Sequence, residues 1–447
     1  MRRFYILMAV LSVAAGVAAQ ELSLDSCVAL AVRNNVKTKN AQLNVEKAEQ
    51  VKQQALTKYF PDISLVGMGY HAARPLFEYG INDIENASAR NYLNALYAEY
   101  GRALGLENSF SLFQKGYMAT ATAMQPIYAG GRIVNGNKLA KLGVEAAQIQ
   151  NEIAAQEVVL QTEESYWLVV SLKEKLKTIA QADELLDTLV RDADVAQSAG
   201  LVTQNDVLKV RLKKNELSSS RLKAENGLVL ATMVLCQTIG VEYNDSIVLT
   251  DSIPAECRSP LDFYRSPTDA LAERSEVQLL DINVEAKELE RKMVMGESLP
   301  QVGFGASYGY SHLYESASNK SNGVLFATVQ IPITGWWETS RKLKEHDVTI
   351  RMAENERKDL TEKMGLQTQQ AWNALCESYE QVTIASEAVE NAKENLRSVG
   401  SSYRAGLVPL SEMLEAQTLL RQTLDALCDE RISYQLCVTR YRQLTGQ

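Results

Sequence analysis

Internal repetition is the feature that most constrains how this chain can fold. Residues 126–240 align with residues 332–446 at a constant offset of 206, without a gap. The stretch Ala-Gly-Leu-Val occurs in both copies, at 199–202 and at 405–408, and matches at offsets of 239 to 241 continue upstream. An unbroken offset over this length predicts one structural unit used twice.

Each copy contains two long stretches with helical character. No proline interrupts residues 127–253 or 333–408, and helix-forming residues are abundant in both. Between residues 168 and 190, apolar residues recur at steps of three, four and seven, the spacing of a helix or a coiled-coil seam. A helix from Arg132 to Ala196 would be about 90 Å long, too long for a compact globule. The sequence therefore predicts helical hairpins at 132–239 and 338–446.

The two Ala-Gly-Leu-Val stretches are the predicted hairpin tips. Glycine at 200 and 406 supplies the left-handed conformation that commonly ends a helix. Thr203 with Asp206, and Ser411 with Glu412, are the predicted N-terminal caps of the returning helices. The tip residues are Ala199, Gly200, Leu201, Val202, Ala405, Gly406, Leu407 and Val408.

Four segments break the helical period and are predicted strands: 62–73, 115–127, 300–310 and 322–333. Each has about ten residues, the length that a tilted transmembrane strand needs. In the last two, apolar residues alternate with small or polar ones, which predicts one apolar face. The residues that we expect to face lipid are Val302, Phe304, Ala306, Tyr308, Leu325, Ala327 and Val329.

A sheet in a membrane must close, because unpaired backbone groups are costly in lipid. Four strands cannot close. Two chains would give eight strands and an interior filled by side chains, whereas three chains would give twelve strands and room for water. We therefore expect a homotrimer. Trp336 and Trp337 suit a membrane interface, although packing at the strand-to-helix joint is an equal alternative.

Composition and termini restrict the function further. Residues 1–19 have the basic start, apolar run and small-residue end of a secretory signal, with cleavage expected after Ala19. A net charge of −9 argues against a nucleic-acid partner. Six scattered cysteines and three distant histidines show no metal-ligand or catalytic spacing, so we expect neither an enzyme nor a cofactor.

The chain resembles the TolC-like outer membrane efflux proteins over essentially its whole mature length. The resemblance rests on Phe60-Pro61 and Leu299-Pro300 before the strands, on the Gln-Pro-Ile-Tyr-Ala-Gly-Gly-Arg junction at 125–132, and on the paired tips. It implies a homotrimer with a twelve-stranded β-barrel in the outer membrane that continues into a periplasmic barrel of long helical hairpins. It also implies an exit duct for an efflux pump or type I secretion system, working with a periplasmic adaptor and an inner-membrane transporter.

On this resemblance the chain divides into four parts. After the signal at 1–19, residues 20–240 form the first repeat and residues 269–447 the second. Residues 241–268 form an equatorial linker that contains a short strand at 247–250.

The resemblance also implies functional residues near the tips. Family members narrow the periplasmic mouth with acidic or interlocking polar residues just before the second tip. A solvated helix face is an equal alternative, because exposed ion pairs contribute little. The gate candidates are Arg191, Asp192, Asp194, Glu394 and Arg397. We further expect the tips to contact the adaptor, because an exposed leucine at each apex needs a cover; pure turn chemistry is the alternative.

One alternative function shares the helical part of this prediction. A secreted or surface-attached coiled-coil adhesin would share the long helices but would not need four membrane-length strands. The long loop at 74–114, with a helix expected at 88–104, could serve surface display, phage or toxin contact, or a pore lid. Nothing in the sequence selects the cargo.

Overall fold

The computed structural model describes most of the chain after residue 20. The described residues are 21–74, 77–101, 103–112, 115–200, 202–244, 247–313, 318–333 and 335–446. The predicted signal segment at 1–19 and the tip residue Leu201 lie outside them.

The chain forms two compact units that cut across the two repeats. The first unit comprises residues 1–48, 144–284 and 353–447, and the second comprises residues 49–143 and 285–352. Each repeat contributes its strands and the start of its first hairpin helix to the second unit, and the rest of its hairpin to the first unit. The boundaries of the two sequence repeats therefore differ from the boundaries of the two compact units.

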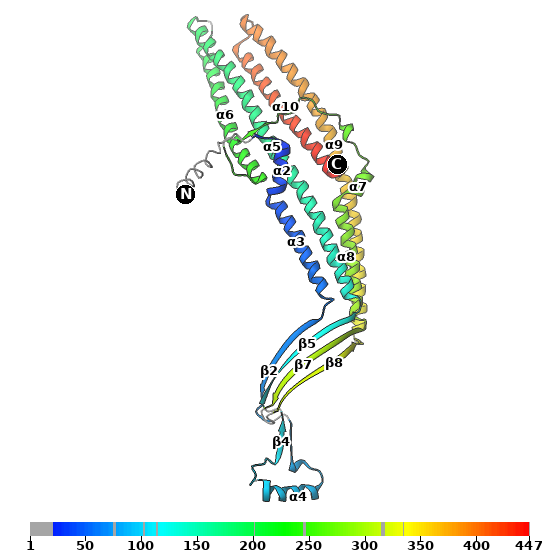
Figure 1. The fold of residues 1–447 in the computed structure, drawn as a ribbon. Coiled ribbons are helices and arrows are strands. Elements are labelled where there is room, and N and C mark those ends of the chain that lie inside the picture. Colours follow the sequence, from blue (N-terminus) through cyan, green and yellow to red (C-terminus); the bar gives the residue numbers. More distant parts are fainter. Residues whose placement is uncertain are drawn as a thin grey trace, which may run out of the picture. The chain divides into compact units, whose positions relative to one another are not determined.

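The helical hairpins keep the spacing of the sequence repeat. Helix α5 (Arg132–Ser198) is followed by α6 (Gln204–Ile239), and α9 (Gly335–Arg404) by α10 (Leu410–Thr445) (Figure 1). Both ends of α10 lie 206 residues beyond the ends of α6. The hairpins predicted at 132–239 and 338–446 correspond to these four helices.

The caps at the two tips differ from each other. The Thr203 side chain accepts from Asp206 N, and the Asp206 carboxylate accepts from Thr203 N, so this predicted cap is confirmed. The prediction for Ser411 is wrong, because α10 begins at Leu410 with Pro409 at its N-cap. Proline has no side-chain acceptor, and the preset φ of its ring starts the helix without one.

Shorter elements of the first unit lie within the linker or flank the hairpin helices. They are β1 (Glu21–Leu22), α2 (Leu24–Asn34), β6 (Val248–Leu249), the 3-10 turn η3 (Pro260–Phe263) and α7 (Pro267–Glu273). Strand β6 pairs in parallel with β1, which places the strand expected at 247–250. Helices α3 (Val36–Thr57) and α8 (Ser275–Glu297) extend through both units.

Three buried tyrosines hold the linker segment 241–268. The bonds are Tyr166 Oη to Asp251 Oδ2 (2.8 Å), Tyr434 Oη to Arg258 O (2.5 Å), and Arg265 N to Tyr441 Oη (3.2 Å). Burial raises the pKa of Tyr434 to about 12, so its hydroxyl stays a donor at neutral pH.

The second unit contains a four-stranded antiparallel sheet in the order β2-β5-β7-β8 (Figure 1). The strands are β2 (Asp62–His71), β5 (Lys115–Ala129), β7 (Gln301–Leu313) and β8 (Ser318–Gln330). The predicted bounds of the fourth strand, 322–333, were wrong at both ends. Strand β8 starts earlier because Ser318 pairs with Leu313, and it stops before Pro332, which has no N–H for a ladder.

The link between β2 and β5 contains a small module of its own. It comprises β3 (Phe77–Gly80), the 3-10 turn η1 (Ile81–Asp83), α4 (Ala87–Leu96), the π-helical turn η2 (Tyr97–Gly101) and β4 (Ser109–Leu112). The helix expected at 88–104 is therefore α4 with its π-helical extension, and it ends earlier than predicted.

Candidate functional site

The strand register gathers apolar side chains on one face of the sheet. Ala306 pairs with Ala123 on β5 and with Leu325 on β8, and Ala123 pairs with Ile63 on β2. Residues directly opposite each other in a ladder share a face. One row across all four strands is therefore apolar.

The neighbouring row lies on the other face and is more polar. Thr122 pairs with Ser64 and with Ser307, and Ser307 pairs with Val324. Successive residues of a strand point to opposite faces, so this face differs in chemistry from the first.

The seven residues predicted to face lipid all lie on the apolar face. Phe304 pairs with Ala327 and Val302 with Val329, in the same alternation as Ala306 and Leu325. Leu325 is 74% exposed. The sheet thus presents a broad apolar surface that the other described residues leave largely uncovered.

The sheet is also open at both edges. Among the described strands, β2 and β8 each have one neighbour. Their outer backbone groups are available for pairing with another strand. In the described part of the chain, no helix is long and apolar enough to span a membrane.

The junction between β5 and α5 depends on two glycines from different repeats. Gly130, at a φ of +64°, approaches the backbone of Gly296 so closely that a Cβ on Gly130 would lie 2.1 Å from Gly296 O. A Cβ on Gly296 would lie 2.4 Å from Gly130 O. Neither position can hold a side chain without moving backbone, which explains the first glycine of the Gly-Gly-Arg motif.

Trp336 and Trp337 lie beside this junction at the start of α9. Both are exposed, and Trp336 Nε1 donates to Ser298 O at 3.0 Å. Trp336 therefore takes part in the packing at the strand-to-helix joint, whereas the ring of Trp337 is exposed.

At the other end of the helices, the tips are tight turns. Gly200 has a φ of +78° and Gly406 a φ of +72°, and a Cβ on either would meet nothing within 4 Å. Glycine is favoured at these two positions because of the left-handed backbone conformation, and not because another atom lies close to the Cα. After α9, Leu407 N donates to Ser402 O at 2.9 Å, the closing bond of a Schellman motif. Leu407 itself is 78% exposed.

The remaining predicted tip residues flank these turns. Ala199 N donates to Val195 O at 3.1 Å and Ala405 N to Ser401 O at 3.1 Å. Val202 and Val408 are half-buried.

The gate candidates pair within each hairpin. Arg397 donates to Glu394 one helical turn earlier, with Nη2 to Oε1 at 2.7 Å and both side chains exposed. Asp194 instead pairs with Arg211 across the first hairpin, at 3.0 Å. Arg191 bonds within its own helix, to Asp187 O at 3.3 Å. The five predicted residues thus form no single cluster in one chain.

Two further residues at this end were not among the predicted site residues. Arg211 is the partner of Asp194, and several basic residues of α6 were equal choices in the sequence. Tyr403 is half-buried in the apolar cluster of the tips. Burial, followed by the negative charges of Asp192 and Asp206, raises the pKa of Tyr403. Tyr403 on α9 thus lies near acidic groups of the first hairpin.

The first hairpin has more charged pairs between its helices than the second. Acidic residues of α5 pair with basic residues of α6 at Asp183–Arg221, Asp187–Lys214 and Asp194–Arg211. The counterparts of Asp183 and Arg221 in the second repeat, Val389 and Leu427, are buried in an apolar cluster. At this position an ion pair in one copy of the hairpin is therefore replaced by apolar packing in the other.

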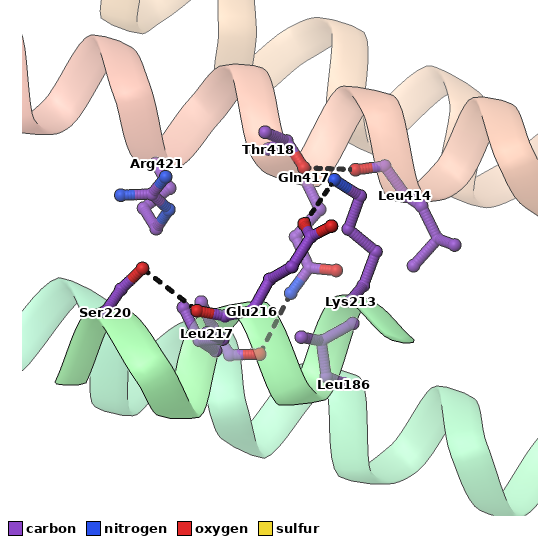
Figure 2. Close-up of a pocket in the computed structure, with 10 residues that line it drawn as sticks. Leu186, Lys213, Glu216, Leu217, Ser220, Leu414, Gln417, Thr418 and Arg421 are labelled. Carbon is purple, nitrogen blue, oxygen red and sulfur yellow. Dashed lines mark hydrogen bonds and ion pairs between the residues drawn. The ribbon is translucent and has the colours of Figure 1, made fainter. Parts of the chain in front are cut away.

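Gln417, the counterpart of Arg211 in the repeat, links the two hairpins. Its side chain is only 7% exposed, and its Nε2 donates to Ala182 O on α5 at 3.0 Å (Figure 2). Its Oε1 is buried and has no hydrogen-bond partner in the described residues. Gln417 lines a cavity of about 100 Å³ between α5, α6 and α10. Figure 2 shows Gln417 among the other lining side chains.

This cavity is small and its rim groups are already paired. Lys213 Nζ donates to Glu216 Oε2 at 2.8 Å, and Arg421 pairs with Asp425 at 2.8 Å (Lys213, Glu216 and Arg421 are labelled in Figure 2). In the described part of the chain, no group of three His, Cys, Asp or Glu side chains could hold a metal ion.

Comparison with known proteins identifies the C-terminal part of the chain. Residues 266–447 match the sequence profile of a family described as outer membrane efflux protein. This segment is similar in sequence to the outer membrane efflux protein domain. It contains the whole second repeat, and the ungapped offset relates residues 126–240 to it. A search of curated protein sequences found no significant match.

Solved outer-membrane channels share the fold of both repeats, not of the efflux protein domain alone. The Campylobacter jejuni outer membrane channel CmeC has a TM-score of 0.75 at 16% identity, covering 95% of this chain and 85% of that one. The Vibrio cholerae outer membrane protein VceC has a TM-score of 0.71 at 14% identity, covering 94% and 96%. The Neisseria gonorrhoeae outer membrane channel MtrE, solved in an open state, has a TM-score of 0.74 at 12% identity, covering 95% and 88%. The predicted fold class, long helical hairpins with a small sheet, is confirmed.

Proposed function

We propose that this chain is one subunit of an outer-membrane exit duct, which passes small molecules or exported protein across the periplasm and the outer membrane. The observation that carries the proposal is the sheet: a four-stranded surface, apolar on one face and open at both edges, in a chain with an outer membrane efflux protein domain. The duct provides a path and has no catalytic role in this proposal.

Three copies complete the sheet. The free edges of β2 and β8 pair between neighbouring subunits and give twelve strands, with no edge left in the lipid. The face that contains Val302, Phe304, Ala306 and Tyr308 on β7 turns to the lipid, together with the residues paired to it on β8, Leu325, Ala327 and Val329. The face with Ser64, Thr122 and Ser307 lines the lumen.

Fractionation separates this proposal from a secreted coiled-coil protein. The chain is expected to be extracted with the outer membrane and to migrate as a heat-modifiable trimer on semi-native gels. Recovery as a monomer among soluble periplasmic or secreted proteins would contradict the duct.

The hairpin tips are the proposed docking surface of a periplasmic adaptor, which connects the duct to an inner-membrane transporter. The exposed Leu407 supports this role, because a leucine at an apex gains about 1.5–3 kcal/mol when a partner buries it. The other tip residues position it through the turn that Gly406 allows.

Replacing Leu407 with cysteine tests the docking surface. In cells with a working pump, a photoactivated crosslinker on Leu407→Cys should capture the adaptor, because the tip is covered during transport. Leu366→Cys is the matched control, since Leu366 is equally exposed on α9 but far from the tip. Equal capture from both positions, or none from Leu407→Cys, would argue against tip docking.

We further propose that the charged residues before the tips narrow the periplasmic mouth. Asp194, Glu394 and Arg397 lie about two to three helical turns before Gly200 or Gly406. Asp194 pairs with Arg211 on the returning helix, and Glu394 pairs with Arg397. Hydrogen bonds from Arg397 lower the pKa of Glu394. A carboxyl whose folded pKa is depressed keeps its pairing above its ordinary pKa and loses it as pH falls through the lowered value. The second pair should therefore persist at every pH above the usual range of glutamate.

Channel recordings in planar bilayers test the gate. Asp194→Ala and Arg397→Ala should each increase the open probability, because removing one partner frees the other to leave the mouth. The stability of the trimer should change by less than about 1 kcal/mol, since the pairs are exposed. Lys363→Ala, which removes an exposed pair with Asp359 elsewhere on α9, is the control. Unchanged conductance and voltage response in both gate variants would discard the gate.

A further inference from the structure

Hydrogen bonds connect the parts of the module between β2 and β5. From α4, Arg90 Nη1 donates to Ile84 O at 3.2 Å, and Asn94 Nδ2 donates to Asn82 Oδ1 at 3.0 Å. Tyr97, in the turn that follows, donates to Leu106 O at 2.8 Å. These bonds link the segments of the module, but none of its described side chains forms a buried apolar core.

One exposed face of α4 and of the turn after it has large apolar side chains. Tyr92, Leu96 and Tyr100 follow one another at steps of four residues, which places them near one helical face. Tyr92 is 69% exposed and Leu96 44% exposed. We call these three residues the α4 stripe. Leu104 and Leu106, just beyond it, are exposed as well.

Such a module needs a cover to be stable. Of the described side chains between 77 and 112, none is buried; the one buried residue is Gly101. A two-stranded hairpin with four residues in each strand, as in β3 and β4, is at best marginally stable in water. The missing apolar contacts must therefore come from outside the module, and the α4 stripe is the surface that offers them.

Position favours other copies of this chain as the cover, and charge argues against a lipid surface. Residues 77–112 contain five carboxylates and two arginines, so the phosphates of a lipid surface would repel the module. The module extends from β2, the open edge at which the next copy must pair if the sheet is to close. Each subunit then contributes one α4 stripe together with its four strands. The stripe lies at the ends of the strands away from the helical hairpins.

We propose that the α4 stripes of three copies pack against one another around the pore axis and cap the outer mouth of the duct. This inference rests on the proposed function, because it requires the trimer. It assigns the long loop the role of a self-associating lid, in preference to a receptor for a foreign protein.

Cysteine crosslinking in the intact trimer tests the cap. Tyr92→Cys and Leu96→Cys, treated with a short bis-maleimide, should give covalent dimers and trimers of the chain at a yield several-fold above Asn91→Cys. Asn91 is the matched control because it is exposed on α4 but points away from the stripe. The unsubstituted chain reports the background from its own six cysteines.

Semi-native gels of samples without the crosslinker distinguish failure of the cap from failure of the proposed trimeric duct. A semi-native gel that shows the trimer, together with stripe crosslinking no better than that of Asn91→Cys, overturns the cap and leaves the duct standing. Adducts to a different protein at Tyr92→Cys and Leu96→Cys also overturn it. Absence of the trimer in the unsubstituted chain would contradict the proposed function itself.

Discussion

Gly130→Ala is expected to prevent assembly of the folded protein. The new methyl group would lie 2.1 Å from the carbonyl oxygen of Gly296, so the backbone at the junction of β5 and α5 would have to move. The left-handed φ of +64° adds strain of about 1–2 kcal/mol for any residue with a Cβ. Together these effects should cost more than about 3 kcal/mol. The measurement is the amount and thermal midpoint of the heat-modifiable trimer in outer membranes.

Gly131→Ala is the matched control for this substitution. Gly131 also has a positive φ, of +77°, but its Cβ would lie 3.6 Å from the nearest atom, Asn135 Nδ2. Only the conformational strain remains, so the loss should be about 1–2 kcal/mol and the trimer should still form. Equal losses for Gly130→Ala and Gly131→Ala would show that the close approach of the two repeats contributes nothing.

Leu325→Arg is expected to reduce the stability of the membrane-inserted sheet by about 2–4 kcal/mol, the range for an arginine at the midplane on the lipid face of a barrel. Leu325 lies near the middle of β8 and belongs to the apolar row with Ala306, Ala123 and Ile63. Unfolding of the reconstituted protein from lipid vesicles by denaturant measures the loss.

Val324→Arg provides the comparison on the same strand. Val324 precedes Leu325 and points to the opposite face, in the row with Ser307, Thr122 and Ser64. An arginine there would meet water in the lumen, so stability should stay within about 1 kcal/mol of the unsubstituted protein, as for an ordinary surface substitution. If Val324→Arg were the more harmful of the two, the assignment of the sheet faces would be reversed.

The helical part of the fold was readable from the sequence to within a few residues. The gapless offset carries the helix boundaries of one hairpin onto the other, except at the start of α9, which lies at Gly335 and not at residue 338. The positive-φ glycines at 200, 240, 406 and 446 end the four helices. The ends of the strands were harder to predict from the sequence. Alternation of apolar residues continues to Ile331 and Ile333, but the ladder of β8 with β7 ends at Gln330.

The candidate site was only partly accessible. Charges before the tips stand out in the sequence, yet the partner of Asp194 lies across the hairpin among several basic residues of α6. Nor did the repeat predict that Gln417 reaches Ala182 while its counterpart Arg211 pairs inside its own hairpin. These choices depend on the distance between side chains of different helices, which no spacing along one helix encodes.

The sequence by itself determined that one strand-and-hairpin unit is used twice, because helix periodicity, glycine turns and an unbroken offset are local properties of the chain. Tertiary structure alone decided the register that aligns Ile63, Ala123, Ala306 and Leu325 on one face. It also decided the approach of Gly130 to Gly296, two residues far apart in the chain. The register and the close approach of the two glycines both depend on which segments pack together in the fold. A shift of one residue in the strand pairing would move every side chain of a strand to the other face.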